Sequence, residues 1–345
     1  MMPVSERLSE RELRVLEAVV HAYVETAEPA GSQTIARRYG LGVSSATVRN
    51  IMSDLEARGY LYHPHTSAGR IPTDRAYRAY VDVVMHSAPP STSARRTLAK
   101  ELTGRGNALE ELLHRAAQVL GVLTHELGVA VAPAFEEVIL ERVELVPVSS
   151  ERLLMVFNLR SGAVRTIFVR VPANVAPAAT RQVADVLNGR LAGLTLREIR
   201  RSLPERLRDA TASAQGKELL DIFIAEGEDL FALEPPHPVL GSAQLLAGQP
   251  EFASSNERMR DLLELTERRD LLREALDLRR REGVSITIGG ENADSRLADF
   301  TLVTSSYRVG DVTGMIGVLG PTRMPYDKII GLVEHTGRLV EGLLA

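Results

Sequence analysis

Apolar residues recur at helical spacing through the first 87 residues of the chain. Over residues 9–26, one face of a helix would carry Leu13, Leu16, Val20, Tyr23 and Val24. Ser9, followed by Glu12 three residues later, has the capping-box pattern that begins a helix. The same spacing and flanking cap residues predict three more helices, over about residues 32–40, 44–59 and 73–84.

A short hairpin is predicted between the third and the fourth of these helices. The stretch "YLYHPH" (60–65) indicates a strand, and "GRIP" (69–72) begins its return. Three helices followed by a hairpin are typical of a winged helix-turn-helix, whose third helix enters the major groove of DNA. The proline-rich "SAPPSTSA" (87–94) then predicts a linker.

The rest of the chain changes from helical to strand spacing twice. After a long helix over roughly 95–125, three β-rich runs occupy residues 136–148, 151–160 and 163–172. Helical spacing returns to about residue 245, and strands follow near 283–290, 299–310 and 313–320. Strands on both sides of a helical middle predict one sheet domain that is interrupted by an insertion. A charged amphipathic helix over 256–282 is expected to pack within the chain.

The third helix has a polar face with the residues of a DNA-reading helix. At about 100° per residue, its core face carries Val48, Ile51, Met52 and Leu55. The opposite face carries Ala46, Arg49, Asn50 and Ser53. Arg and Asn make bidentate contacts to guanine and adenine edges, and small neighbours allow close approach to a groove. The alternative is the ordinary solvated face of a surface helix.

Charge supports the nucleic-acid interpretation locally rather than globally. The whole chain has a formal net charge of −4. Between residues 30 and 80 there are seven arginines and three acids (7 − 3), a local charge of +4. Such a patch favours DNA binding, although a small helical domain can also carry a basic face without function.

The segment "HPHTSAGRIPT" (63–73) fits the wing of such a domain. Ser67–Ala68–Gly69 can turn tightly, and Thr66, Ser67 and Arg70 can donate to phosphates. A metal site at His63 and His65 is the weaker alternative, because no third ligand lies nearby in the sequence. The segment also lacks the Gly-x-x-x-x-Gly-Lys pattern of a nucleotide phosphate loop.

Two long motifs resemble the signatures of a known repressor family. "EPAGSQTIARRYGLGVSSATVRNIMSDLEARGYL" with "PHTSAGRIPTDRAYRAYVD", and later "GMIGVLGPTRMPYDKII", resemble the HrcA family of heat-inducible transcription repressors. The resemblance covers essentially the whole chain. It implies a bacterial repressor of chaperone operons that binds an inverted-repeat operator in double-stranded DNA as a homodimer, assisted by the GroE chaperonin.

The resemblance also assigns roles to individual residues. It implies base reading by Ser45, Ala46, Arg49 and Asn50. It implies phosphate and wing contacts by Ser44, Thr47, Thr66, Ser67, Gly69 and Arg70. The sequence departs from the family at Gln33, where many relatives carry Arg, and at Ile51, where an acid is common.

The expected fold class is α+β, with an N-terminal winged helix-turn-helix and a GAF-like α/β domain interrupted by a mainly helical inserted dimerisation domain. The expected boundaries are 1–87 for the DNA-binding domain and 88–94 for the linker. The GAF-like domain takes 95–175 and 248–345, and the inserted dimerisation domain takes 176–247.

Other chemistry has little support in the sequence. The chain has no cysteine, which excludes disulfides and thiolate sites, and we expect no catalytic residue, cofactor or metal. The glycine-rich stretches 285–292 and 310–321 are typical of ordinary β-turns more often than of phosphate loops. Four acids are expected on the solvent face of a strand, Glu136, Glu137, Glu141 and Glu144.

The remaining expectations concern the cell and the nearest alternative function. No secretory leader or membrane span is evident, so we expect a cytoplasmic, nucleoid-associated protein. The alternative to a heat-shock repressor is a metabolite-responsive regulator that senses a small ligand through its GAF-like domain.

Overall fold

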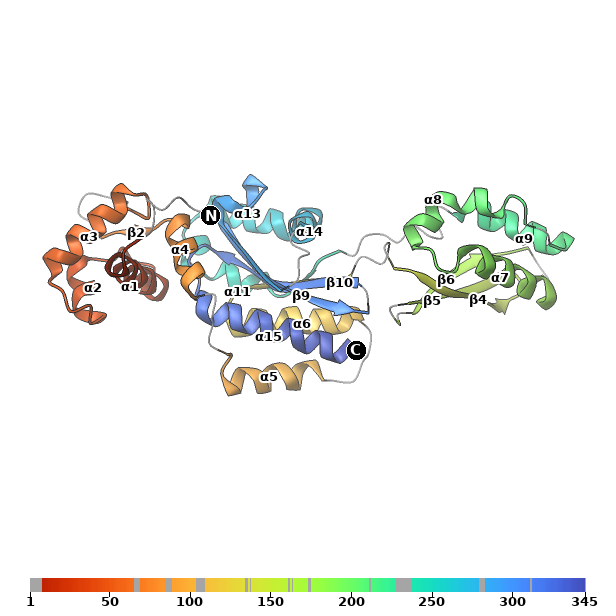
Figure 1. The fold of residues 1–345 in the computed structure, drawn as a ribbon, viewed down its shortest axis with the longest axis horizontal. Coiled ribbons are helices and arrows are strands. Elements are labelled where there is room, and N and C mark those ends of the chain that lie inside the picture. Colours follow the sequence, from red (N-terminus) through yellow and green to blue (C-terminus); the bar gives the residue numbers. More distant parts are fainter. Residues whose placement is uncertain are drawn as a thin grey trace. The chain divides into compact units, whose positions relative to one another are not determined.

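The computed structural model divides the chain into two compact units (Figure 1). It describes residues 8–64, 69–84, 89–103, 109–133, 136, 138–160, 162, 164–172, 175–210, 212–227, 237–278, 283–310 and 312–344. Unit 1 comprises Met1–Val131, Pro238–Ser306 and Met315–Val340. Unit 2 comprises Ala132–His237, Tyr307–Gly314 and Glu341–Ala345.

The N-terminal segment of unit 1 (residues 8–84) has the predicted order of elements. Its helices are α1 (Glu10–Thr26), α2 (Ser32–Arg38), α3 (Ser45–Ala57) and α4 (Asp74–Val84). The hairpin strands β1 (Leu61–Tyr62) and β2 (Ile71–Pro72) pair antiparallel between α3 and α4. The predicted capping box at Ser9 and Glu12 is confirmed, because each side chain bonds the backbone of the other.

A five-stranded sheet forms the rest of unit 1. Its order is β7-β3-β10-β9-β8, so a strand at residues 127–131 lies beside one at residues 312–321. The strands are β3 (Leu127–Val131), β7 (Val239–Leu240), β8 (Val284–Ile288), β9 (Phe300–Val309) and β10 (Val312–Pro321). The accompanying helices are α5 (Thr92–Leu102), α6 (Leu109–Thr124) and α15 (Tyr326–Leu344), with α6 and α15 on one face of the sheet (Figure 1).

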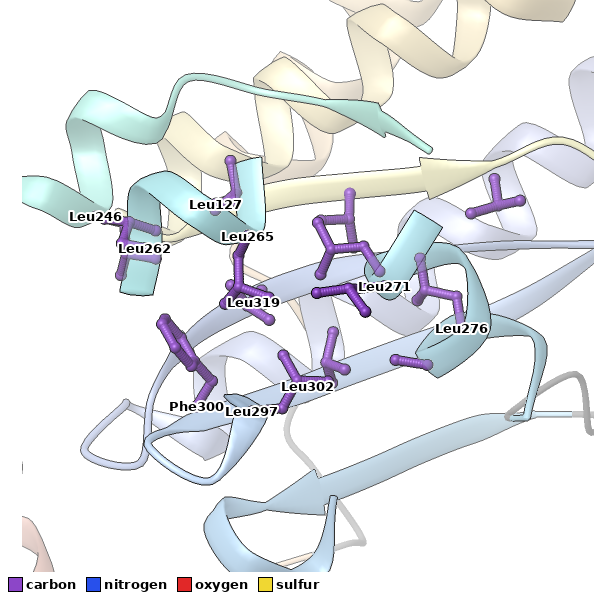
Figure 2. Packing of buried hydrophobic residues seen from close by; sticks show 14 of the residues in the cluster. Leu127, Leu246, Leu262, Leu265, Leu271, Leu276, Leu297, Phe300, Leu302 and Leu319 are labelled. Atoms are coloured by element: carbon purple, nitrogen blue, oxygen red, sulfur yellow. The ribbon is translucent and has the colours of Figure 1, made fainter. Parts of the chain in front are cut away.

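Short helices cover the other face of this sheet. They are α11 (Ala243–Ala247), α12 (Pro250–Ala253), α13 (Asn256–Glu267) and α14 (Arg269–Asp277). Leu262 and Leu265 of α13 and Leu276 of α14 are buried in one cluster with Leu127 and Leu302 of the sheet (Figure 2). Packing of the charged stretch within the chain is therefore confirmed, although it forms two helices that meet at a non-helical Arg268 (φ −89°, ψ 70°).

Unit 2 has a separate three-stranded sheet. Its antiparallel strands β4 (Leu140–Ser149), β5 (Arg152–Leu159) and β6 (Val164–Arg170) follow one another in the chain. The helices α7 (Pro177–Leu191), α8 (Leu196–Leu207) and α9 (Ala214–Ala225) lie along one face (Figure 1).

The placement of these three strands differs from the sequence prediction. The sequence placed them in the first part of the interrupted sheet domain, which was expected to end at residue 175. In the structure β3 is the strand from this region that joins the five-stranded sheet, while β4–β6 pair with one another. Strands joined by tight turns pair locally, and β5 buries alternate residues (Leu153, Met155, Phe157 and Leu159) on its covered face.

Candidate nucleic-acid interface

Burial of one stripe fixes the rotation of α3. Val48, Met52 and Leu55 are all 0 % exposed, so the opposite face must be directed to solvent. That face carries the four exposed residues Ala46, Arg49, Asn50 and Ser53, as the sequence predicted. Neither the Arg49 nor the Asn50 side chain forms a hydrogen bond or ion pair with any residue that the structure describes.

The start of α3 is tied by its own cap. The Ser44 hydroxyl accepts a hydrogen bond from the Thr47 amide at 3.1 Å and lies 3.0 Å from the Thr47 hydroxyl. Ser44 and Ser45 are exposed, and Thr47 is half-buried. The cap uses the Thr47 amide, so the amides of Ser45 and Ala46 are the ones in this first turn without a partner among the described residues, and free amides at a helix N-terminus suit phosphate.

The base of the hairpin is held against the turn before α2. The Arg70 amide donates to the Ala30 carbonyl at 3.0 Å, and the Ala30 amide donates back at 2.9 Å. A Cβ atom at Gly69 would lie 2.4 Å from the Ala30 backbone, so the glycine is required by the close approach of two backbone segments. Thr66 and Ser67, with His65 and Ala68, lie outside the described residues.

The Arg70 side chain faces α3 rather than solvent. It is 9 % exposed, its Nε donates to Glu56 at 3.0 Å, and one terminal nitrogen donates to the Ser53 hydroxyl at 2.8 Å. The other Glu56 oxygen lies 2.5 Å from His63 Nδ1. Burial raises the pKa of Glu56, but the bonds to His63 and Arg70 outweigh burial and lower the pKa overall. Glu56 thus joins both arms of the hairpin to α3.

This network was not predicted from the sequence. Arg70 was expected to donate to phosphate, and His63 was given no role. Arg70 lies 14 residues after Glu56 and 17 residues after Ser53 along the chain. The usable signal was weak, namely an acid one turn after Ser53 on the helix that precedes the hairpin.

The basic surplus of residues 30–80 is largely paired within the protein. Arg38 pairs with Glu25, Arg58 with Glu12 and Arg78 with Glu291, in addition to the Arg70–Glu56 pair. Arg75 donates to the Arg58 carbonyl and lies 4.6 Å from the centre of the Tyr60 ring. Within the described part of the chain, Arg37 and Arg49 are the two arginines of this stretch without a partner. The free positive charge is therefore concentrated on α2 and α3.

The other sequence candidates have structural explanations. The amide of Gly290 donates to Asp74 at 2.9 Å, so a side chain of the protein occupies the first glycine-rich stretch. Glu136 lies 3.2 Å from Arg197, and Glu144 accepts a hydrogen bond from Asn158. Glu141 is exposed, and Glu137 lies outside the described residues. Across the described ranges no cluster of His, Asp or Glu could hold a metal ion, and no helix is long and apolar enough to cross a membrane.

Comparison of the sequence with known proteins identifies the family that this chain resembles. A family model described as HrcA protein C terminal domain matches residues 110–330. The heat-inducible transcription repressor HrcA of Chlorobium phaeobacteroides (strain BS1) is 39% identical over 95% of this chain and 96% of its own length. The repressors of the same name from Chlorobium limicola and Desulforamulus reducens are 38% and 36% identical, each over 96% of both chains.

One solved structure supports the fold alone. A crystal structure of a hypothetical protein aligns with a TM-score of 0.63 and 24% identity, over 98% of this chain and 99% of that chain. It supports the mixed helix-and-sheet fold class. The curated relatives are named for heat induction and repression, which favours that function over the metabolite-sensing alternative.

Proposed function

Because the chain belongs to the HrcA family of heat-inducible transcription repressors, we propose that it reads operator DNA through α3. The observation that carries this proposal is the exposed pair Arg49 and Asn50, opposite the buried stripe and without a partner among the described residues. Ala46 and Ser45 beside them are small enough to let the helix approach base edges. Arg49 would bind guanine and Asn50 adenine, each in the bidentate geometry that these side chains favour.

Phosphate contacts would come from the surroundings of α3. The N-terminus of α3 beside the Ser44–Thr47 cap offers the amides of Ser45 and Ala46, and Arg37 on α2 offers a guanidinium without a partner among the described residues. Thr66, Ser67 and Gly69 of the wing remain part of the proposal. For Arg70 we propose a positioning role, because its bonds to Glu56 and Ser53 fix the hairpin against α3.

Two arginine variants test the assignment against each other. Arg49→Ala should lower the preference for operator over random DNA by about 1–3 kcal/mol, because it removes a base contact. Arg37→Ala should weaken both DNAs about equally and reduce the salt slope of binding by about one. The measurement is a binding titration of each variant on both DNAs at several salt concentrations. An unchanged operator preference in Arg49→Ala would show that α3 is not the recognition helix.

The proposed homodimer would use the free face of the three-stranded sheet in unit 2. Strand register places Val146, Leu154 and Phe168 in one row across β4, β5 and β6, opposite the face covered by helices. Val146 is 43% exposed and Phe168 55%, and Val148 and Val164 at the ends of the same face are also exposed. A second copy of the chain would remove this apolar face from water.

A two-fold dimer would match an inverted repeat, with recognition helices about 34 Å apart or a multiple of that distance. A footprint on the upstream regions of chaperone operons, combined with a salt titration, tests operator and symmetry together. Protection of a single, asymmetric half-site would contradict the dimer. Assistance by the GroE chaperonin stays a prediction, tested by whether added GroE restores operator binding after a heat treatment.

A further inference from the structure

A loop of the five-stranded sheet forms hydrogen bonds with α4, the helix that follows the hairpin. Asp74 at the start of α4 accepts a hydrogen bond from the Gly290 amide at 2.9 Å. One turn later, Arg78 donates through Nε to Glu291 at 2.7 Å and through a terminal nitrogen to the Ile286 carbonyl at 2.8 Å. The loop belongs to "SITIGGEN", the glycine-rich stretch that the proposed DNA contacts leave without a role.

The loop is shaped to receive the Asp74 carboxylate. Gly289 has φ +52°, and a Cβ atom there would lie 2.0 Å from Asp74 Oδ2, so any other residue would displace the carboxylate. Glu291 also accepts from the Ile288 amide at 2.9 Å, which closes the loop on itself. The side-chain amide nitrogen of Asn292 donates at 2.9 Å to three carbonyls, those of Gly289, Leu297 and Phe300. The loop is therefore held by hydrogen bonds of its own in addition to its contacts with α4.

The electrostatics of the Arg78–Glu291 pair agree with this geometry. Burial raises the pKa of Glu291, but the hydrogen bonds from Arg78 and from the Ile288 amide outweigh it and lower the pKa overall. Both side chains are partly screened, at 26% and 35% exposed. The contact is thus a charge-assisted, partly exposed ion pair rather than a buried one.

A second contact holds the N-terminal segment at another helix. Arg323, in the loop after β10, donates to the Val24 carbonyl in the last turn of α1 at 2.7 Å and to Glu251 at 3.0 Å. The Tyr326 ring lies 5.8 Å from that of Tyr77 on α4. A contact with α4 alone would leave the N-terminal segment free to rotate about that contact. The second contact, with α1, prevents this rotation.

We propose that Asp74, Arg78, Gly289 and Glu291 are positioning residues for operator recognition, which fix the direction of α3 and so determine which half-site spacing a dimer accepts. The inference rests on the proposed function, since it needs two copies on one operator. A rigidly held pair of recognition helices binds half-sites at one spacing, because any other spacing leaves one helix out of its groove. A loosely held pair binds at several spacings, and it loses more conformational entropy when it binds at the native spacing.

The test compares three DNAs with Arg78→Ala and with the control Arg96→Ala, which removes an exposed arginine of α5 that has no partner in the described ranges. The DNAs are one half-site, the native operator and an operator whose spacer is changed by a few base pairs. Arg78→Ala should leave half-site affinity within about twofold but reduce the preference for the native spacing by about fivefold or more. Arg96→Ala should keep that preference.

Three outcomes would overturn the inference. In the first, Arg78→Ala keeps the wild-type spacing preference. In the second, it weakens all three DNAs in proportion and lowers the melting temperature, which indicates a merely structural role. In the third, Gly289→Ala behaves like wild type on all three DNAs. A wild-type protein that binds none of the DNAs would instead refute the proposed function itself.

A reversible disulfide between α4 and the 285–292 loop provides a second test, in which the contact is replaced by a covalent bond rather than removed. The chain has no cysteine, so a pair introduced by Asp74→Cys and Gly290→Cys can form one disulfide. A Cβ atom at Gly290 meets nothing closer than the Asp74 carboxylate, at 3.8 Å. The oxidised double variant should show the wild-type spacing preference, and the reduced form should lose it. Equal preferences in the two forms would contradict the positioning role.

Discussion

Phe300 and Phe168 lie on strands of two different sheets, and the two sheets treat them in opposite ways. Phe300, on β9 of the five-stranded sheet, is 1% exposed and stacks on Phe252 at 5.5 Å between ring centres. Phe168, on β6 of unit 2, is 55% exposed, and its ring is contacted by the Arg152 guanidinium at 4.7 Å. The same side chain is core in one sheet and surface in the other.

The difference follows from how many faces of each sheet are covered. β9 and β10 bury nearly every residue, because helices cover both faces of the five-stranded sheet. β5 buries every second residue, because helices cover one face of its sheet. A half-covered sheet with apolar residues on its free face therefore marks where a partner would bind, and the fully covered sheet marks where the chain stabilises itself.

The largest expected effect is the contrast between the two phenylalanines. Phe300→Ala should lower the free energy of unfolding by about 3–5 kcal/mol, since it leaves a cavity beside Phe252. Phe168→Ala should cost the monomer less than about 1 kcal/mol. Thermal melting of both variants at one low protein concentration measures the contrast. Equal losses would mean that the free face of unit 2 is already buried within one chain.

A charge on the free face should separate the proposed dimer without unfolding the protein. Leu154→Asp lies at the centre of the row that crosses β4, β5 and β6. It should weaken self-association by about 2–4 kcal/mol, which is about 30- to 700-fold, because the carboxylate would be desolvated in the interface. Sedimentation over a concentration series gives the dissociation constant, and Glu141→Gln serves as the control at an exposed position of β4. Unchanged association in Leu154→Asp would exclude this face as the interface.

Substitution of two glycines tests the difference between a closely packed site in unit 1 and an open site in unit 2. A Cβ atom at Gly128 of β3 would lie 1.8 Å from the Ala117 carbonyl of α6, so Gly128→Ala should destabilise the protein by about 1–3 kcal/mol. Gly189 of α7 has nothing within 4 Å, so Gly189→Ala should stabilise it by about 0.5–1 kcal/mol through helix propensity. The two melting temperatures should therefore move in opposite directions. A shared direction would contradict the packing difference.

Local features of the fold were predictable from the sequence, whereas sheet partners were not. The cap at Ser9 and the burial of Val48, Met52 and Leu55 on α3 depend on residues within one or two turns, and both are confirmed. Ile51, the fourth residue predicted for the core face, is half-buried. The strands of residues 140–170 were recognised as strands but assigned to the other sheet. Alternation of apolar and polar residues indicates that one face is covered, but it does not say which strand lies alongside.

The candidate site divides in the same way. The exposed face of α3 follows from helical periodicity alone, so Arg49 and Asn50 could be placed in advance. The orientation of Arg70 depends on Glu56 and Ser53, and the need for Gly69 depends on the Ala30 backbone. Counting charges also overestimated the basic patch, because several of its arginines pair with acids that are distant in sequence, such as Glu291 for Arg78. These contacts exist only after the chain has folded.

A pH-dependent effect is expected at a carboxyl group that is buried next to the five-stranded sheet. Glu126, just before β3, is 2% exposed and accepts a hydrogen bond from Gln249 at 2.8 Å. Burial raises its pKa well above the usual value of 4.5, although Gln249 and Arg323 oppose this and Glu251 adds to it. Below the unfolded pKa both states are protonated, and as the pH rises above about 4.5 the unfolded chain ionises first. The wild-type protein therefore loses stability over that range, until the folded pKa is passed.

Glu126→Gln cannot ionise, and its amide can keep one polar contact to Gln249. It should melt like the wild type near pH 4.5 and be more stable by about 1–3 kcal/mol near pH 8, which a pH series of melting curves would detect. Glu144→Gln on the open sheet should show no such divergence, because Glu144 is exposed in the folded chain as well. If Glu126→Gln is instead less stable than the wild type at pH 8, the folded protein holds Glu126 as a carboxylate paired with Arg323, and the covered sheet tolerates a buried charge.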